Sequence, residues 1–387
     1  MDDKMISATI AEVFEEIADA LETGSYGKKV RVGLTILGSE HGPGELVAGA
    51  ELAMRQSDDL EVVLIGQAVE SDLELVEVAD EQDAHAKMDQ LLLSGELAAA
   101  VTMHYPFPIG VSTVGMVVTP AKGKEMLLAT TTGTSTTERV TAMLKNTLYG
   151  IATAKAYGRL NPTVGILNID GARQVERSLR KLQEGGYPLC FADSARSDGG
   201  AVMRGNDLLM GVPDVMVTDS LTGNVLMKMF SAYNSGGCYE TLGYGYGPGV
   251  GENYDRIICI ISRASGAPVI AGAIRFAAQC AKGKLLDKAR AEFSAAKKAG
   301  WQEILDSLAA AAAPKDSDAA TVTPPPKKTV TEDIPGIDVM ELEDAVRVLW
   351  KENIYAESGM GCTGPIIMIA PEDKETAVKI LQENRYL

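Results

Sequence analysis

Runs of apolar residues alternate along this chain with stretches in which apolar and polar residues recur at helical spacing. Apolar runs at 30–37 and 60–65 flank an amphipathic stretch at 45–55. A Gly-rich turn separates the first run from that stretch. A strand, a helix and a second strand in this order form a βαβ unit, which implies a parallel sheet.

The same order of elements recurs as far as residue 262. Further strands are predicted at 98–103, 126–130, 163–168, 214–218 and 256–262. Further helices are predicted at 138–157, 172–184 and 225–232. Strands that alternate with helices throughout favour an α/β domain over residues 30–313, doubly wound around a mostly parallel sheet.

The N-terminal segment, residues 1–29, contains a predicted amphipathic helix at 5–22. Its apolar stripe consists of Ile6, Ile10, Val13, Ile17 and Leu21. A stripe of this kind is buried against another surface. That surface is either the body of the same chain or a partner subunit.

The composition changes near the C-terminus. Residues 314–335 are rich in Pro and small polar residues, which bury too little surface to order themselves, so we predict a linker there. Residues 336–387 should form a small tethered α/β module. Its predicted elements are a helix at 338–353, a Gly-rich loop at 359–364, a strand at 366–370 and a helix at 372–384.

The formal net charge is −17, from 36 basic and 53 acidic residues. An acidic chain repels phosphate backbones and anionic lipids, which argues against partners made of nucleic acid or membrane. Five cysteines without a CxxC motif and three scattered histidines predict neither a disulfide framework nor a metal site. The acidic N-terminus does not resemble a signal peptide, and no apolar run is long enough to span a bilayer, so we expect a cytoplasmic protein.

Residues 218–224, between a predicted strand and a predicted helix, are the first candidate for binding an anion. Free backbone N–H groups at a helix start favour phosphate, and polar side chains there add donors. Lys228 lies about one helical turn further on and could reach back. The alternative is a capped helix start without a ligand. The residues concerned are Asp219, Thr222, Gly223 and Asn224.

Two more segments follow predicted strands and carry polar residues that could bind an anion. The threonine-rich stretch 130–137 follows a predicted strand and contributes Thr132, Gly133, Thr134 and Ser135 as phosphate-binding candidates. The stretch 262–268 contributes Arg263 and Ser265, because arginine binds oxyanions with two parallel hydrogen bonds. A plain loop and a surface arginine are the respective alternatives.

Two Gly-rich stretches carry weaker signals. His41, in the turn 38–44, could act as an acid, a base or an anion ligand, although such a turn alone is weak evidence. The run 243–251 predicts a flexible functional loop or a subunit contact.

Cys362 stands in a tight turn of glycines. Backbone N–H groups that converge there would favour a thiolate and stabilise the oxygen of a thioester intermediate. We therefore predict Cys362 as a nucleophile, although a cysteine in a Gly-rich loop can be incidental. The residues predicted to form this oxyanion nest are Gly359, Gly361, Thr363 and Gly364. Cys259 and Cys280 lie in apolar elements and should be buried.

The order of motifs resembles that of the PlsX-type phosphate acyltransferases. The similarity rests on 38–53, on the block 161–168 that ends at Asn168, on the turn 205–207 with Asn206, and on 214–225. It covers roughly residues 30–280. The resemblance implies a fold like that of phosphotransacetylase and isopropylmalate dehydrogenase. It also implies a cleft that exchanges acyl groups between a thioester and phosphate.

The whole chain, tail included, is similar to the component C alpha subunits of glycine, sarcosine and betaine reductases, where the Gly-rich cysteine near the C-terminus carries an acetyl thioester. Cys362 matches that cysteine. The resemblance implies acetyl phosphate as the product, a thiolase-like beta subunit and a small selenoprotein as partners in a hetero-oligomer, inorganic phosphate as co-substrate and no cofactor. A stand-alone acyltransferase that uses acyl carrier protein and a non-catalytic scaffold for the beta subunit are the alternatives.

Overall fold

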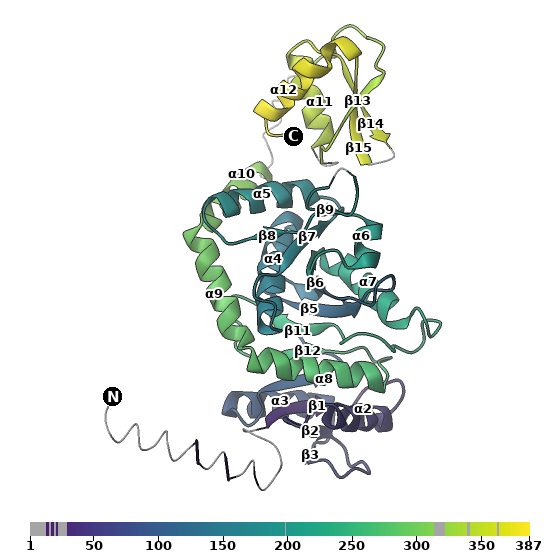
Figure 1. Cartoon of the computed structure of the whole chain (residues 1–387), viewed down its shortest axis with the longest axis vertical. Helices are drawn as coiled ribbons and strands as arrows, with labels where there is room; N and C mark the ends of the chain where they lie inside the picture. Colours follow the sequence, from purple (N-terminus) through teal and green to yellow (C-terminus); the bar gives the residue numbers. More distant parts are fainter. Residues whose placement is uncertain are drawn as a thin grey trace, which may run out of the picture.

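A computed structural model describes residues 29–197, 199–312, 322–338, 341–361 and 364–387, together with Val13, Phe14, Ile17, Ala18 and Leu21 (Figure 1). Within this part, twelve strands form one mixed sheet. They are β1 (Val30–Thr35), β2 (Leu60–Gly66), β3 (Leu75–Glu77), β4 (Ala99–Thr102), β5 (Val111–Val118), β6 (Glu125–Thr134), β7 (Thr163–Leu167), β8 (Cys190–Phe191), β9 (Val202–Met203), β10 (Val215–Val217), β11 (Gly247–Val250) and β12 (Ile258–Ile260). The helices around the sheet are α2 (Pro43–Arg55), α3 (Glu81–Ser94), α4 (Arg139–Ala156), α5 (Ala172–Glu184), α6 (Gly205–Met210), α7 (Ser220–Ala232), α8 (Ala267–Lys282), α9 (Leu285–Lys298) and α10 (Trp301–Ala312).

The strands lie in the order β3-β2-β1-β4-β12-β11-β5-β6-β10-β7-β8, with β9 beside β7. Pairing is parallel except where β11 meets β12 and β5, and where β5 meets β6. The sheet therefore consists of two parallel groups that run in opposite directions, joined through β11 and β5. The prediction of a mostly parallel α/β fold is confirmed, whereas the antiparallel centre was not predicted.

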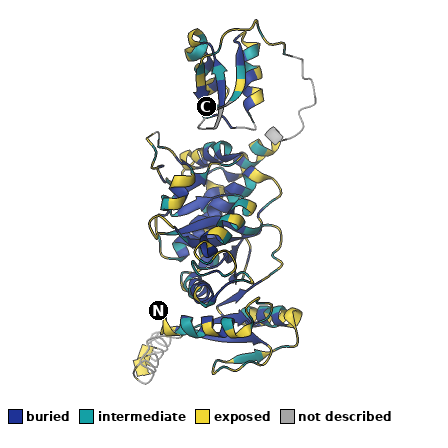
Figure 2. Ribbon diagram, turned by 90° about the vertical axis from the view of Figure 1, so that its right-hand side faces the viewer, coloured by how far each residue is buried: buried dark blue, intermediate teal, exposed yellow. Residues whose placement is uncertain are grey.

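Helices cover both faces of the sheet, because alternate side chains of a strand point to opposite sides. Along β2, Val62 and Leu64 join the core under α2 and α8, whereas Val63 and Ile65 join the core under α3 and α7. Figure 2 shows the strands as the most deeply buried elements of this body. This layering is the doubly wound arrangement that the alternation of elements predicts.

The Gly-rich run at 243–251 is part of the core, which corrects the prediction of a flexible loop. Its residues Gly247–Val250 form β11 and are buried. At Gly247, φ is 80°, and a Cβ atom would lie 1.7 Å from the carbonyl oxygen of Val114. Glycine is needed here because β11 approaches the backbone of β5 more closely than a side chain allows.

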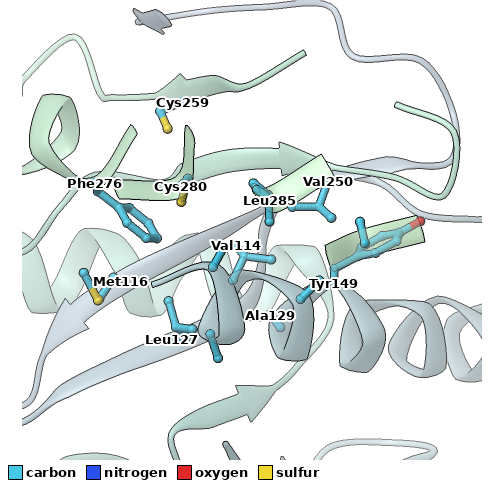
Figure 3. Packing of buried hydrophobic residues seen from close by; sticks show 14 of the residues in the cluster. Val114, Met116, Leu127, Ala129, Tyr149, Val250, Cys259, Phe276, Cys280 and Leu285 are labelled. Carbon is cyan, nitrogen blue, oxygen red and sulfur yellow. The ribbon is translucent and has the colours of Figure 1, made fainter. Parts of the chain in front are cut away.

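Cys259 of β12 and Cys280 of α8 are buried, as predicted. Figure 3 shows both near the ring of Phe276, on the side of the core that Met116 also lines. Burial raises the pKa of each of these two thiols well above its ordinary value. Both cysteines therefore act as small apolar residues of the core.

The C-terminal module has a sheet and a core of its own, at the yellow end of the chain in Figure 1. The sheet is antiparallel, in the order β13-β15-β14. Ile367, Leu349 and Leu381 are among the buried residues that hold it against two helices. The elements are β13 (Glu332–Pro335), α11 (Leu342–Lys351), β14 (Ala356–Gly361), β15 (Gly364–Ile369), η1 (Pro371–Asp373) and α12 (Lys374–Glu383).

The module corrects two predicted boundaries. Residues 332–335, predicted as linker, form β13 and pair with β15. The Gly-rich loop predicted at 359–364 is largely strand, because Gly359 and Gly361 belong to β14 and Gly364 to β15. Only two residues separate the paired strands in the sequence, Cys362 and Thr363, and both lie outside the described residues.

Two further observations concern segments near the ends of the chain. Glu341, before α11, accepts hydrogen bonds from Gln174 at 2.6 Å and from Arg177 at 2.5 Å, so the module meets α5 of the main body. Val13, Ile17 and Leu21 of the predicted N-terminal stripe are exposed, whereas Ile6 and Ile10 lie outside the described residues.

Candidate active site

A cavity of about 200 Å³ lies where the two parallel groups of the sheet meet. Loops that follow β4 and β12 supply one side of it, and the end of β6 and the first turns of α7 supply the other. Ligands in α/β proteins bind beyond the carboxyl ends of strands. The cavity is lined by Met103, His104, Tyr105, Phe107, Thr132, Asn224, Tyr246, Ile260, Ile261 and Ser262.

The polar side of the cavity combines three of the predicted segments. Asn224 and Thr132 line it together with Ser262, the residue before Arg263. The amide of Asn224 donates a hydrogen bond to the carbonyl oxygen of Thr131 at 3.0 Å, which fixes the side chain against β6. The ammonium of Lys228 lies 2.7 Å from the hydroxyl oxygen of Ser262. Phosphate-binding candidates from positions 132, 224 and 228 therefore converge.

Lys228 is held by a carboxylate that the sequence analysis did not single out. Glu240 is 1% exposed, and its Oε1 atom lies 2.5 Å from the ammonium of Lys228. Its Oε2 atom accepts a hydrogen bond from Ser265 at 2.7 Å. Glu240 thus joins two predicted site residues, Lys228 and Ser265, and satisfies both of its oxygens inside the protein. Its signal in the sequence is that it is the only acidic residue between Asp219 and Glu252.

The apolar side of the cavity is aromatic. The rings of Tyr105 and Phe107 meet edge to face, with their centres 5.1 Å apart, and Phe107 meets Tyr254 in the same way at 5.8 Å. Gly249 makes room for this packing, since a Cβ atom there would lie 2.4 Å from the Phe107 ring. Burial, and then the charge of Glu240, raise the pKa of Tyr246 above its ordinary value.

The start of α7 differs from the predicted anion cradle. The helix begins at Ser220, and the carboxylate of Asp219 accepts the Thr222 N–H at 2.8 Å and the Thr222 hydroxyl at 3.0 Å. Asp219 and Thr222 therefore cap the helix, and a carboxylate stands where a phosphate was predicted. Gly223 has a packing role, because a Cβ atom there would lie 1.7 Å from the carbonyl oxygen of Thr130.

The threonine-rich stretch is also corrected. Residues 130–134 continue strand β6, and the helix that follows begins only at Arg139. Ser135 is buried and bonds to Ser112 at 2.6 Å and to Asn146 at 2.5 Å, so it is a core residue. Gly133 and Thr134 lie near the end of the strand, outside the residues that line the cavity. Of the four candidates here, Thr132 alone lines the cavity that the described residues enclose.

Arg263 and His41 lie on loops that touch each other beside the cavity. The carbonyl oxygen of Arg263 accepts the Glu40 N–H at 2.9 Å, and among the described residues no partner binds the exposed Arg263 side chain. The His41 ring lies edge-on to Tyr239, with their centres 5.0 Å apart. The hydroxyl of Tyr239 donates to Glu45 and holds the pKa of that carboxyl below its ordinary value. An exposed cation thus remains available near Ser262.

Asn168 and Asn206 are not brought to the cavity. Asn168 follows β7 and Asn206 lies in α6, and both are exposed. Neither is among the residues that line the cavity. The neighbouring Asp207, in contrast, is fully buried and holds Ser194 and the backbone of Ala195.

The comparisons with known proteins agree with the motifs. A model of the family described as "Fatty acid synthesis protein" matches residues 30–368. The glycine/sarcosine/betaine reductase complex component C subunit alpha of Peptoclostridium acidaminophilum is 60% identical over 98% of this chain and 98% of its own length. The chain belongs to the family that the matching model describes.

More distant relatives match a smaller share of the chain. The phosphate acyltransferase of Thermus thermophilus is 27% identical over 52% of this chain and 70% of its own length. Among solved structures, a branched-chain phosphotransacylase from Enterococcus faecalis covers 65% of this chain and 99% of its own, at 16% identity and a TM-score of 0.45.

Two features are absent from the described residues. None of the helices there is long and apolar enough to cross a membrane. No group of three or more His, Cys, Asp or Glu side chains in that part of the chain is arranged to hold a metal ion.

Proposed function

We propose that this chain is the alpha subunit of component C of a glycine, sarcosine or betaine reductase, and that it transfers an acetyl group from a thioester to inorganic phosphate. The likeness to a component C alpha subunit over nearly the whole chain supports the place in the complex. The likeness to phosphate acyltransferases supports the reaction type. The product is acetyl phosphate, and phosphate is a co-substrate, so the reaction needs no cofactor.

The observation that carries this proposal is the size and lining of the cavity. Its volume of about 200 Å³ equals that of about seven water molecules in the liquid, at about 30 Å³ each. Phosphate fits beside Asn224 and Ser262, with the cations of Lys228 and Arg263 near it. A two-carbon group fits against Phe107. The alternative of a stand-alone acyltransferase would bind a longer acyl group at the same wall, and comparing acetyl with long-chain thioesters as substrates separates the two.

The proposed reaction exchanges one bond for another. An oxygen of hydrogenphosphate attacks the carbonyl carbon, so a carbon–oxygen bond forms while the carbon–sulfur bond breaks. The phosphate proton goes to the departing thiolate. Lys228 and the amide of Asn224 hold the phosphate, and backbone N–H groups stabilise the negative charge that develops on the carbonyl oxygen. A thioester suits this step because thiolate is a good leaving group.

Cys362 is the proposed carrier of the acetyl group. It follows Gly361 at the end of β14, and the donors of the neighbouring backbone would favour its thiolate form. The stretch rich in Pro and small polar residues before β13 tethers the module, and a tether sets the effective concentration of the thiol at each site that it visits. The partners in this scheme are a thiolase-like beta subunit and a small selenoprotein, in the cytoplasm.

The test is to trap the intermediate. The complete reductase complex is incubated with isotope-labelled glycine under reducing conditions without phosphate, and the labelled acetyl group is located by mass spectrometry. We expect it on Cys362, and we expect added phosphate to release it as acetyl phosphate. Cys362→Ser should lower turnover by orders of magnitude, whereas Cys238→Ser, which replaces an exposed cysteine of the main body, should leave it unchanged.

One result would overturn the proposal. If the label stays on the beta subunit and the Cys362→Ser complex is fully active, the chain is a scaffold on which the partner performs the chemistry. Assembly with the beta subunit, measured by size-exclusion chromatography, should survive Cys362→Ser in either case.

A further inference from the structure

A second cavity, of about 420 Å³, lies at the other end of α8 from the candidate active site. The helix starts beside Ser265 and ends at Lys282. Its last turns contribute Arg275, Gln279 and Lys282 to the cavity wall. Tyr157 and Tyr244 line it as well, from the end of α4 and from the segment before β11. None of these side chains belongs to the site described above.

Among the described residues, no hydrogen bond or ion pair engages the guanidinium of Arg275. Its Nε atom is shielded from solvent and donates no hydrogen bond there. The nearby carboxylates are already engaged. Glu125 accepts from Tyr244 and Tyr157 and pairs with Arg159 at 3.8 Å, and Asp59 pairs with Lys282. Since Arg275 lines the cavity, an oxyanion bound there could pair with its guanidinium.

The charge of the cavity also favours an anionic ligand. Its lining includes two cations, Arg275 and Lys282, and one carboxylate, Asp59, which leaves one positive charge. The whole chain carries −17, so a positive recess is unusual for this protein. Arginine binds phosphate and carboxylate groups through two parallel hydrogen bonds. The amide of Gln279 is placed to add a neutral donor to the same wall.

The rest of the wall suits an apolar body. Phe276 packs edge to face against Tyr157 with 5.5 Å between ring centres, and against Tyr244 with 6.3 Å. Pockets for small molecules combine such apolar surfaces with a few polar groups that fix orientation. The volume of about 420 Å³ lies within the range of about 300–1,000 Å³ that is typical of these pockets.

We propose that this cavity is a second ligand site, which binds a small metabolite through a phosphate or carboxylate group on Arg275 while the body of the metabolite lies against the aromatic wall. The proposal is independent of the reaction at the first site. It accounts for a guanidinium that the described residues leave without an acceptor. It also explains why the positive charge stands among rings and not on the open surface.

The test is calorimetric titration of the full chain with phenyl phosphate, benzoate and phenol. The first two share a ring and differ in the oxyanion, so the tighter of them identifies the group that Arg275 receives. Phenol, which lacks the charge, should not bind. Arg275→Met should weaken binding of the tighter oxyanion at least tenfold. Arg275→Lys keeps the positive charge but loses the planar guanidinium, so it should weaken binding of the oxyanion less. Lys298→Met removes an exposed positive charge elsewhere and should leave it unchanged.

Arg275→Met removes no partner that the described residues contain, so its urea denaturation midpoint without ligand should not fall. Three results would each overturn the proposal. The first is that neither oxyanion binds. The second is that Arg275→Met binds both oxyanions as tightly as the parent chain does. In the third, Arg275→Met releases the beta subunit from the complex, which would make the cavity a protein contact.

Discussion

Glu240 holds the ammonium of Lys228 at 2.5 Å from a position that is 1% exposed. Lys228 itself is only half-buried, and its other contact is the hydroxyl of Ser262 at the cavity wall. A buried carboxylate therefore aims a more accessible cation at the cavity. Since Glu240 also accepts a hydrogen bond from Ser265, it ties Lys228 to the loop that carries Ser262.

Replacing Glu240 by Gln should weaken phosphate binding. The amide keeps the shape but loses the charge that holds Lys228. Because hydrogen bonds to charged groups contribute about 1.5–3 kcal/mol, we expect the variant to lose about 2 kcal/mol of stability. We also expect the apparent phosphate constant to rise about tenfold, which corresponds to about 1.4 kcal/mol. Urea denaturation and initial rates against phosphate concentration measure the two effects.

Glu51→Gln is the matched control, because Glu51 on α2 is partly exposed and, among the described residues, forms its ion pair with Arg55. Glu51→Gln should change neither the free energy of unfolding nor the apparent phosphate constant. If Glu240→Gln unfolds more easily but keeps its phosphate constant, Glu240 supports the fold and does not position Lys228.

Asn224→Ala should raise the phosphate requirement with the fold intact. The substitution removes a donor at the cavity and the hydrogen bond to Thr131. A neutral hydrogen bond contributes about 1 kcal/mol, so the phosphate constant should rise about fivefold and stability should fall by about the same free energy. An unchanged phosphate dependence would remove Asn224 from the site.

Phe107→Ala should relax the selectivity for short acyl groups. The ring forms part of the cavity wall, and without it the space beside the acetyl group grows. One methylene group in such a pocket is worth about 1–3 kcal/mol, so propionyl transfer relative to acetyl should increase at least about tenfold. Competition between the two thioesters measures the ratio. Tyr233→Ala, an exposed aromatic residue outside the cavity wall, should leave it unchanged.

The cysteines should react in a fixed order with iodoacetamide at neutral pH. Cys362 should be alkylated first, because backbone donors favour its thiolate, and the exposed Cys190 and Cys238 should follow. Cys259 and Cys280 should react only after unfolding, because burial raises the pKa of both thiols. Peptide mass spectrometry over a time course gives the order. A Cys362 that reacts more slowly than Cys238 would contradict the proposed activation.

The predicted elements agree with the structure where the spacing of apolar residues is regular and glycine does not interrupt it. The helix predicted at 172–184 is α5 with the same bounds, and the strand predicted at 163–168 is β7 to within one residue. β5 and β11 were missed because glycine weakens the strand signal: Gly115 lies within β5, and β11 begins at Gly247. In both places glycine serves the packing of neighbouring segments, which the sequence alone does not reveal.

The site was predictable in its parts and not in its assembly. Segments with phosphate-binding chemistry were identified one at a time, each after a strand. The sequence could not show that Lys228 reaches Ser262, 34 residues away, or that Asn224 reaches Thr131, 93 residues away. Helix capping misled the prediction at Asp219, because the residues that cap a helix are also those that bind anions.

The paired strands β14 and β15 extend beyond the core of the C-terminal module. The pair Ala356 and Ile369 lies in the module's core, and the pair Gly361 and Gly364 lies five residues further along. At about 3.3 Å per residue, the pair Gly361 and Gly364 stands about 17 Å beyond the first pair. Two paired strands are also narrower than the whole module. If Cys362 carries the acetyl group as proposed, these strands could enter a recess that is too narrow for the rest of the module.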